Sequence, residues 1–220
     1  MDHNTKDEIK MGPISLETLQ VDYSSEDSET RRLHNQTAKQ LFDEYGCFVA
    51  KNLLGDAELR PIHRDIQKLI ELRLAHTGLP SQAKTSGVAC FDDGFLPMVQ
   101  TDRAHGGVIY DACQRLTPVH SLSVHPNLLN LSKQLMSTET VISCTLKAVR
   151  ADHPNENTHL LLWHQDYPVI QDSEDGVVFW LPLHDLDQRS GCLLVAPGSH
   201  KLGICPVRVL RSTAKYGGIV

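Results

Sequence analysis

The sequence predicts a mostly β domain, a small barrel built of antiparallel hairpins, with helices in its N-terminal part. Two apolar runs, residues 177–183 and 192–196, are joined by a turn-rich segment and closed by Pro197-Gly198, which suits a type II turn. A third run, residues 141–150, is rich in β-branched residues and alternates as a strand does. A small barrel built of such hairpins can hold a metal at its mouth.

The residues ahead of this barrel have helical periodicity. We expect one helix over residues 31–45 that ends at Gly46, and a longer one over residues 56–76 that is closed by Gly78. The apolar residues 47–50 lie between them and predict a short strand. These helices are expected to have a structural role, packed on one face of a sheet.

The middle of the chain predicts a long loop and two more helices. Residues 80–105 are rich in Gly, Asp, Ser and Pro and lack sustained periodicity. A loop of this length in a compact domain is more often functional than idle, so it is a candidate for substrate contacts, with a disordered surface excursion as the alternative. Helices follow over residues 108–116 and 127–136, with Pro126 suited to the first turn of the second.

Composition predicts one globular domain over residues 30–220. The chain has 220 residues, of which 40% are hydrophobic and 22% charged, so it can bury a sizeable core. Residues 1–29 are polar and acidic and predict a flexible lead-in, although Leu19 and Val21 can attach part of it to the domain.

The net charge and the cysteine pattern limit which binding partners and which cellular compartment are expected. The formal net charge is −6 and the basic residues are scattered, which argues against nucleic acid as a partner. No apolar run approaches the roughly 20 residues that span a bilayer, so no membrane partner is expected. The six cysteines form no C-x-x-C pair and are expected to be reduced thiols, which favours a cytoplasmic protein.

Two H-x-D patterns are candidates for a metal site. His164 and Asp166 follow the apolar run 160–163, and on a strand residues two apart point to the same face. The pair would then supply two members of the His-His-carboxylate triad that holds non-haem Fe(II). His63 and Asp65 instead lie in a helical pattern, where their side chains diverge by roughly 200°. The sequence therefore favours the first pair.

The segments around that pair resemble a known family. They read W-H-Q-D at 163–166, V-F-W-L at 178–181, S-G-C-L at 190–193 and P-G-S-H-K-L-G at 197–203. This combination is similar to the phytanoyl-CoA dioxygenase family, most closely over residues 160–203. The resemblance implies a double-stranded β-helix, also called a jelly roll, of the cupin-like kind. It also implies an Fe(II)- and 2-oxoglutarate-dependent oxygenase that uses dioxygen to hydroxylate a small-molecule substrate.

The resemblance assigns roles to individual residues. His164 and Asp166 would bind Fe(II), and Gln165 and Trp180 would lie beside 2-oxoglutarate. Lys147 belongs to the strand before the H-x-D strand, which helps to line the 2-oxoglutarate pocket in the family. From the residues alone, Trp180 is equally well a core residue and Lys147 equally well faces water.

The sequence departs from the family pattern after the P-G-S-H element. The family's second histidine ligand and the arginine that binds 2-oxoglutarate lie several tens of residues further on, and Lys201–Val220 contains no histidine. We therefore expect a truncated chain whose barrel is incomplete at its C-terminus. His184 and His200 are the only histidines after Asp166, so they are the alternative third ligands.

Two other classes of protein fit parts of this pattern. The missing histidine and arginine favour a catalytically inactive, truncated jelly roll that binds a ligand or partner. A cupin-like metalloenzyme without 2-oxoglutarate would take more histidines to its metal. The residues indicate neither a particular substrate nor an oligomeric state.

Overall fold

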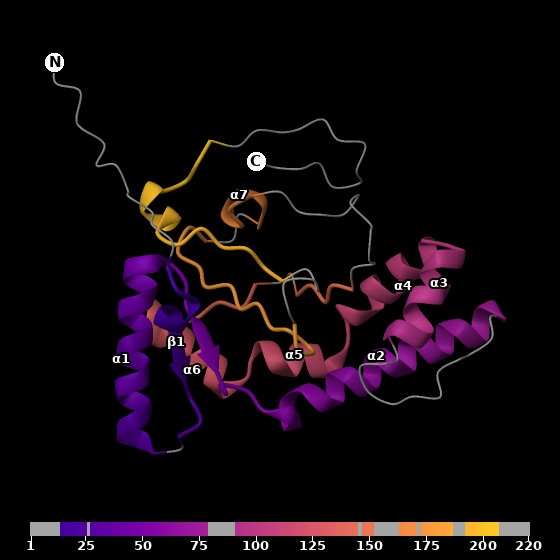
Figure 1. The fold of residues 1–220 in the computed structure, drawn as a ribbon, viewed down its shortest axis with the longest axis horizontal. Coiled ribbons are helices and arrows are strands. Elements are labelled where there is room, and N and C mark those ends of the chain that lie inside the picture. Colours follow the sequence, from indigo (N-terminus) through magenta and orange to yellow (C-terminus); the bar gives the residue numbers. More distant parts are fainter. Residues whose placement is uncertain are drawn as a thin grey trace. The chain divides into compact units, whose positions relative to one another are not determined.

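The computed structural model of the protein describes residues 14–25, 27–78, 91–144, 147–151, 163–170, 173–186 and 192–206. The chain divides into two compact units, and Figure 1 traces their helices and strands along the sequence. Unit 1 comprises Met1–Leu53 and Asp187–Cys205, and unit 2 comprises Leu54–Leu186 and Pro206–Val220. The single domain expected over residues 30–220 stays a prediction.

Unit 1 combines a small parallel sheet with one long helix. Its elements are η1 (Leu16–Leu19), β1 (Gln20–Asp22), α1 (Ser28–Tyr45), β2 (Val49–Lys51) and η4 (Ser199–Leu202). Strands β1 and β2 pair in parallel with Val21 opposite Ala50. Leu19 and Val21 are buried, so this part of the N-terminal segment is attached to the unit.

The limits of α1 follow from its capping residues. The Asp27 carboxylate accepts the Thr30 N–H at 2.7 Å, which satisfies a free donor of the first turn and lowers the pKa of Asp27. At the other end Gly46 has φ 72°, in the left-handed region that glycine reaches without strain. The predicted helix over residues 31–45 and its end at Gly46 are confirmed, with a start three residues earlier.

The segment around η4 caps the C-terminal end of α1. The Gly198 N–H donates to the Tyr45 carbonyl at 2.7 Å, and Nε2 of His200 lies 3.1 Å from the Asp43 carbonyl, to which it donates. Lys201 lies 3.2 Å from the carboxylate of Glu44. We call this set of contacts the α1 clamp. The last carbonyls of a helix have no partner within the helix, so these donors satisfy them.

The turn before η4 confirms the type II prediction at Pro197-Gly198. Gly198 has φ 82° and ψ −8°, the conformation of the third residue of such a turn. The Ser199 N–H donates to the Ala196 carbonyl at 3.2 Å and closes the turn.

Tyr23 lies buried in unit 1 with its hydroxyl lacking a hydrogen-bond partner among the described residues. Its ring meets that of His34 edge to face, with the centroids 5.8 Å apart. Burial raises the pKa of Tyr23 to about 12 from the ordinary value of 10.0, because the phenolate would lose its hydration.

We expect Tyr23→Phe not to destabilise the protein at pH 8, because a buried hydroxyl without a partner carries a desolvation cost that phenylalanine does not have. Above pH 10 the unfolded phenol ionises while the folded one stays neutral, so the wild type loses stability between about pH 10 and 12. At pH 11 the variant should be the more stable by roughly 1 kcal/mol. Urea unfolding at both pH values measures this difference, and a wild type that is the more stable at pH 11 would contradict it.

Unit 2 is helical throughout its assigned elements. They are α2 (Asp56–Thr77), η2 (Phe91–Phe95), α3 (Leu96–Thr101), α4 (Ala104–Cys113), α5 (Thr117–Ser123), α6 (Pro126–Met136) and α7 (Tyr167–Ile170). Helix α2 buries a stripe at i, i+4, i+8 and i+12, made of Ile62, Ile66, Ile70 and Leu74. It packs against η2, α4 and α5.

Three helix predictions in unit 2 are confirmed. Helix α2 ends at Gly78, which has φ 70°. Helix α6 begins with Pro126, where a missing N–H has no cost, and α4 covers most of the predicted residues 108–116. No helix in the described ranges is long and apolar enough to cross a membrane.

The predicted fold class is wrong, because the protein is not a mostly β jelly roll. In the described ranges the sheet consists of β1 and β2 alone, with three residues in each strand. The expected strands at 141–150, 177–183 and 192–196 are irregular wherever the structure describes them.

The three segments that were predicted as strands have residues of high β propensity, but in the part of the chain that the structure describes they lack neighbouring strands to pair with. β propensity measures how well a side chain fits a pleated, half-buried surface and pairs across strands. Val178 is 68% exposed and Leu194 is 72% exposed, so neither apolar run is buried as a strand of a packed sheet would be. An apolar run alone does not supply the neighbouring strands.

The long loop expected over residues 80–105 is also partly wrong. Residues 79–90 lie outside the described ranges, but η2, α3 and the start of α4 occupy most of residues 91–105. Gly94 lies so close to α2 that an added Cβ would be 2.8 Å from Cγ2 of Ile70. The helix there depends on packing against α2, which the weak local periodicity did not indicate.

Candidate functional site

The predicted metal pair lies in a turn and not on a strand. Residues 160–162 are outside the described ranges, and residues 163–166 form an irregular turn that leads into α7. The Asp166 carbonyl accepts the Ile170 N–H at 3.0 Å, so Asp166 begins the first turn of that helix. The strand that was to align the two side chains is therefore absent from residues 163–166.

His164 and Asp166 nevertheless face each other. Nε2 of His164 lies 3.3 Å from Oδ1 of Asp166, and the two side chains are 29% and 44% exposed. Solvent therefore reaches both side chains, and a partly exposed pair of this kind contributes little to stability. One imidazole nitrogen and one carboxylate oxygen converge on the same point.

The donor chemistry of this pair fits two positions of an Fe(II) site. A facial triad takes two histidines and one carboxylate, so one further protein ligand is needed. Among the residues that the structure describes, no set of three His, Cys, Asp or Glu side chains could hold a metal ion.

Neither alternative third ligand completes the pair in the described residues. His184 belongs to unit 2, where its Nδ1 donates to the Asp185 carbonyl at 2.8 Å. His200 belongs to unit 1, where its Nε2 is used in the α1 clamp. The P-G-S-H element therefore serves a helix terminus in this chain.

The predicted co-substrate residues are distributed along irregular segments of unit 2. Gln165, which lies between His164 and Asp166 in the sequence, is partly buried. The Trp180 side chain is 45% exposed, so it is not a core residue. Nζ of Lys147 donates to the Cys144 carbonyl at 2.7 Å. The predicted strand over residues 141–150, which was to place Lys147 beside the 2-oxoglutarate pocket, is irregular where the structure describes it.

The second H-x-D pattern behaves as expected from its helix. Asp65 pairs with Arg64 at 2.9 Å, and Nε2 of His63 donates to the carbonyl of Leu183. The contact between His63 and Leu183 joins residues 120 apart and was missed by the sequence reasoning. No signal in the sequence marks a carbonyl group as the partner of a distant imidazole.

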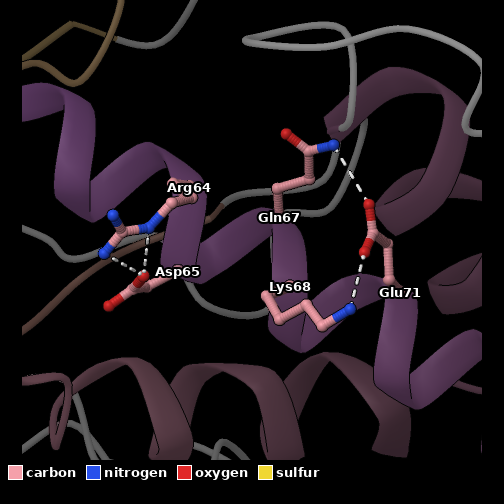
Figure 2. Close-up of a pocket in the computed structure, with 5 residues that line it drawn as sticks. All are labelled: Arg64, Asp65, Gln67, Lys68 and Glu71. Atoms are coloured by element: carbon pink, nitrogen blue, oxygen red, sulfur yellow. Dashed lines mark hydrogen bonds and ion pairs between the residues drawn. The ribbon is translucent and has the colours of Figure 1, made fainter.

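A shallow groove of about 370 Å³ runs along the exposed side of α2 and contains none of the predicted site residues. Figure 2 shows its side chains joined in pairs: Gln67 donates to Glu71 at 3.1 Å, and Lys68 lies 3.4 Å from the same carboxylate. With its cations already beside carboxylates, this groove is a solvated helix face.

Five cysteines lie in the described ranges and none of them is in a disulfide there: Cys47, Cys113, Cys144, Cys192 and Cys205. Burial raises the pKa of the Cys113 thiol to about 11, which makes it a poor nucleophile and a poor metal ligand near neutral pH. Cys113 is therefore not a candidate for the reactive group of the site.

An imidazole and a carboxylate held together in an accessible turn define a candidate metal-dependent enzyme. The phytanoyl-CoA dioxygenase family model matches residues 42–217, a range that includes every predicted site residue. The chain belongs to the phytanoyl-CoA dioxygenase family, as the sequence motifs indicated. Members of this family are generally Fe(II)- and 2-oxoglutarate-dependent oxygenases. Comparison with curated proteins and with solved structures gives no significant match.

Proposed function

We propose that this protein is an Fe(II)- and 2-oxoglutarate-dependent dioxygenase that hydroxylates a small organic substrate. The observation that carries the proposal is the convergence of His164 and Asp166, 3.3 Å apart, in a chain of an oxygenase family. The donor types are those of a non-haem Fe(II) site, and the residues lie at the H-x-D of the family motif.

The pair supplies both donor types that such a site needs. Nε2 of His164 lies 3.3 Å from Oδ1 of Asp166. A metal takes the lone pair of a neutral imidazole and an oxygen of a carboxylate, so Fe(II) binding should depend on pH.

The other proposed residues would bind and orient the co-substrate. When bound, Fe(II) with 2-oxoglutarate and dioxygen supplies the oxidising power that inserts oxygen into a C–H bond of the substrate. Gln165 can donate hydrogen bonds from its amide, and the exposed ring of Trp180 can cover the co-substrate and exclude water. Lys147 would have to leave the Cys144 carbonyl before it could pair with a carboxylate of 2-oxoglutarate.

A second candidate function is a binding protein without turnover. It is favoured by the count of donors, because the described residues supply two protein ligands where a facial triad has three. Such a protein would bind a metal or a small organic acid and release it unchanged.

Succinate formation distinguishes the two. We expect the purified chain, supplied with Fe(II), ascorbate and dioxygen, to convert 2-oxoglutarate to succinate, measured by mass spectrometry. Slow conversion of 2-oxoglutarate to succinate in the absence of the hydroxylation substrate is enough to show that the proposed site is active. Omitting Fe(II) or excluding dioxygen should stop the reaction. Metal binding without any succinate would contradict the oxygenase and support the binding protein.

A further inference from the structure

We propose that His63 is a positioning residue of the proposed active site, and that it anchors the segment carrying Trp180 to α2. Nε2 of His63 contacts the Leu183 carbonyl, and since a carbonyl only accepts, the nitrogen is the donor. The contact joins the first half of α2 to a segment 120 residues further along the chain, within unit 2.

Helix α2 is well packed within unit 2, so a hydrogen-bond donor on it has a defined position. Ile62, the residue before His63, is 1% exposed, and the buried stripe that it begins packs on η2, α4 and α5. The His63 ring is partly buried, so its hydrogen bond is shielded from competing water. A donor on this helix therefore occupies a defined place in the unit.

Residues 173–186, which include the Leu183 carbonyl, form no regular secondary structure, so their position depends on contacts with other segments. Their carbonyls lack the regular partners that a ladder provides. Leu183 follows Trp180 by three residues, and Val178 and Trp180 are both largely exposed. A hydrogen bond at Leu183 restricts how far the Trp180 ring can move relative to α2.

This inference rests on the proposed function for its catalytic consequence. If Trp180 covers 2-oxoglutarate, loosening its segment weakens binding of the co-substrate without touching the metal pair. We expect loss of the His63 donor to raise KM for 2-oxoglutarate about five- to tenfold, the change that one intramolecular hydrogen bond produces, with kcat altered less.

Three variants of α2 separate the hydrogen bond from other effects. His63→Leu fills similar space and removes the donor, whereas His63→Gln retains an N–H. His76→Leu changes an exposed histidine of the same helix and serves as the control. Far-UV circular dichroism establishes that each variant keeps its helices. For fluorescence, all are made in a Trp163→Phe background, where Trp180 is the remaining tryptophan.

Trp180 anisotropy reports the anchor without any activity. We expect it to fall in His63→Leu, and to stay near the parent value in His63→Gln and His76→Leu. Kinetics without the Trp163 change should show the rise in KM in His63→Leu alone. Unchanged anisotropy, or a KM equal to that of His76→Leu, would overturn the proposal. If the parent protein forms no succinate, the proposed function fails, and anisotropy alone then decides whether His63 anchors the segment.

Discussion

Replacing His164 with alanine is expected to abolish Fe(II)-dependent succinate formation and to weaken Fe(II) binding by about 100-fold or more. Even residues that only orient a ligand cost about 10- to 100-fold in metal affinity when they are changed, and His164 would be a ligand itself. Asp166→Asn should have a similar effect, since it keeps the size of the side chain and removes its charge. Anaerobic calorimetry measures the affinity, and succinate formation measures the turnover.

The control for this experiment is His184, the other histidine of unit 2 that was considered as a ligand. His184 lies in unit 2 and donates to its neighbour's carbonyl, so His184→Ala should leave Fe(II) affinity and turnover within about twofold. Wild-type affinity in His164→Ala would refute the proposed metal site. Equal losses in His164→Ala and His184→Ala would instead add His184 to the site as a ligand.

Replacing Gly46 with alanine is expected to destabilise the protein by about 2–5 kcal/mol. Its φ of 72° costs an alanine roughly 1–2 kcal/mol, since the left-handed region crowds Cβ against the backbone. The added methyl would also overlap the His200 ring, whose Cγ would be 2.7 Å away, and overpacking adds about 1–3 kcal/mol. The ring can move aside only by giving up its bond to the Asp43 carbonyl.

Gly78 provides a matched control for this prediction. It also follows a long helix, has φ 70°, and has open space where a Cβ would be placed. Gly78→Ala should therefore cost only the backbone strain, about 1–2 kcal/mol. In a His200→Ala background, Gly46→Ala should cost no more than Gly78→Ala does. Urea unfolding measures the wild type and all four variants, and equal losses for Gly46→Ala and Gly78→Ala in the wild-type background would contradict the role of His200.

The parts of the fold that sequence reasoning predicted are those set by local interactions. A helix is encoded by its own residues and caps, so Gly46, Gly78 and Pro126 mark helix ends correctly. A strand is completed by partners elsewhere, and the apolar run at 177–183 has no ladder in the described structure. The helix at Phe91–Phe95 was not predicted for the same reason, because it packs against α2, which is distant in the sequence.

The candidate site was predicted for a reason that the structure does not support. Two side chains on a strand were expected to converge through a period of two, but His164 and Asp166 converge across a turn before α7. The family motif selected this pair by residue identity and spacing, whatever the local backbone, and its role in metal binding stays a proposal. The contact of His63 with Leu183 lay beyond both kinds of reasoning, since one partner is a backbone carbonyl.

The α1 clamp has a consequence for how the chain folds as it is synthesised. Asp43 and His200 are 157 residues apart, and ribosomes add roughly 5–20 residues per second. The end of α1 therefore waits about 8–30 seconds for its capping donors after it leaves the ribosome. During that interval water satisfies the last carbonyls of α1.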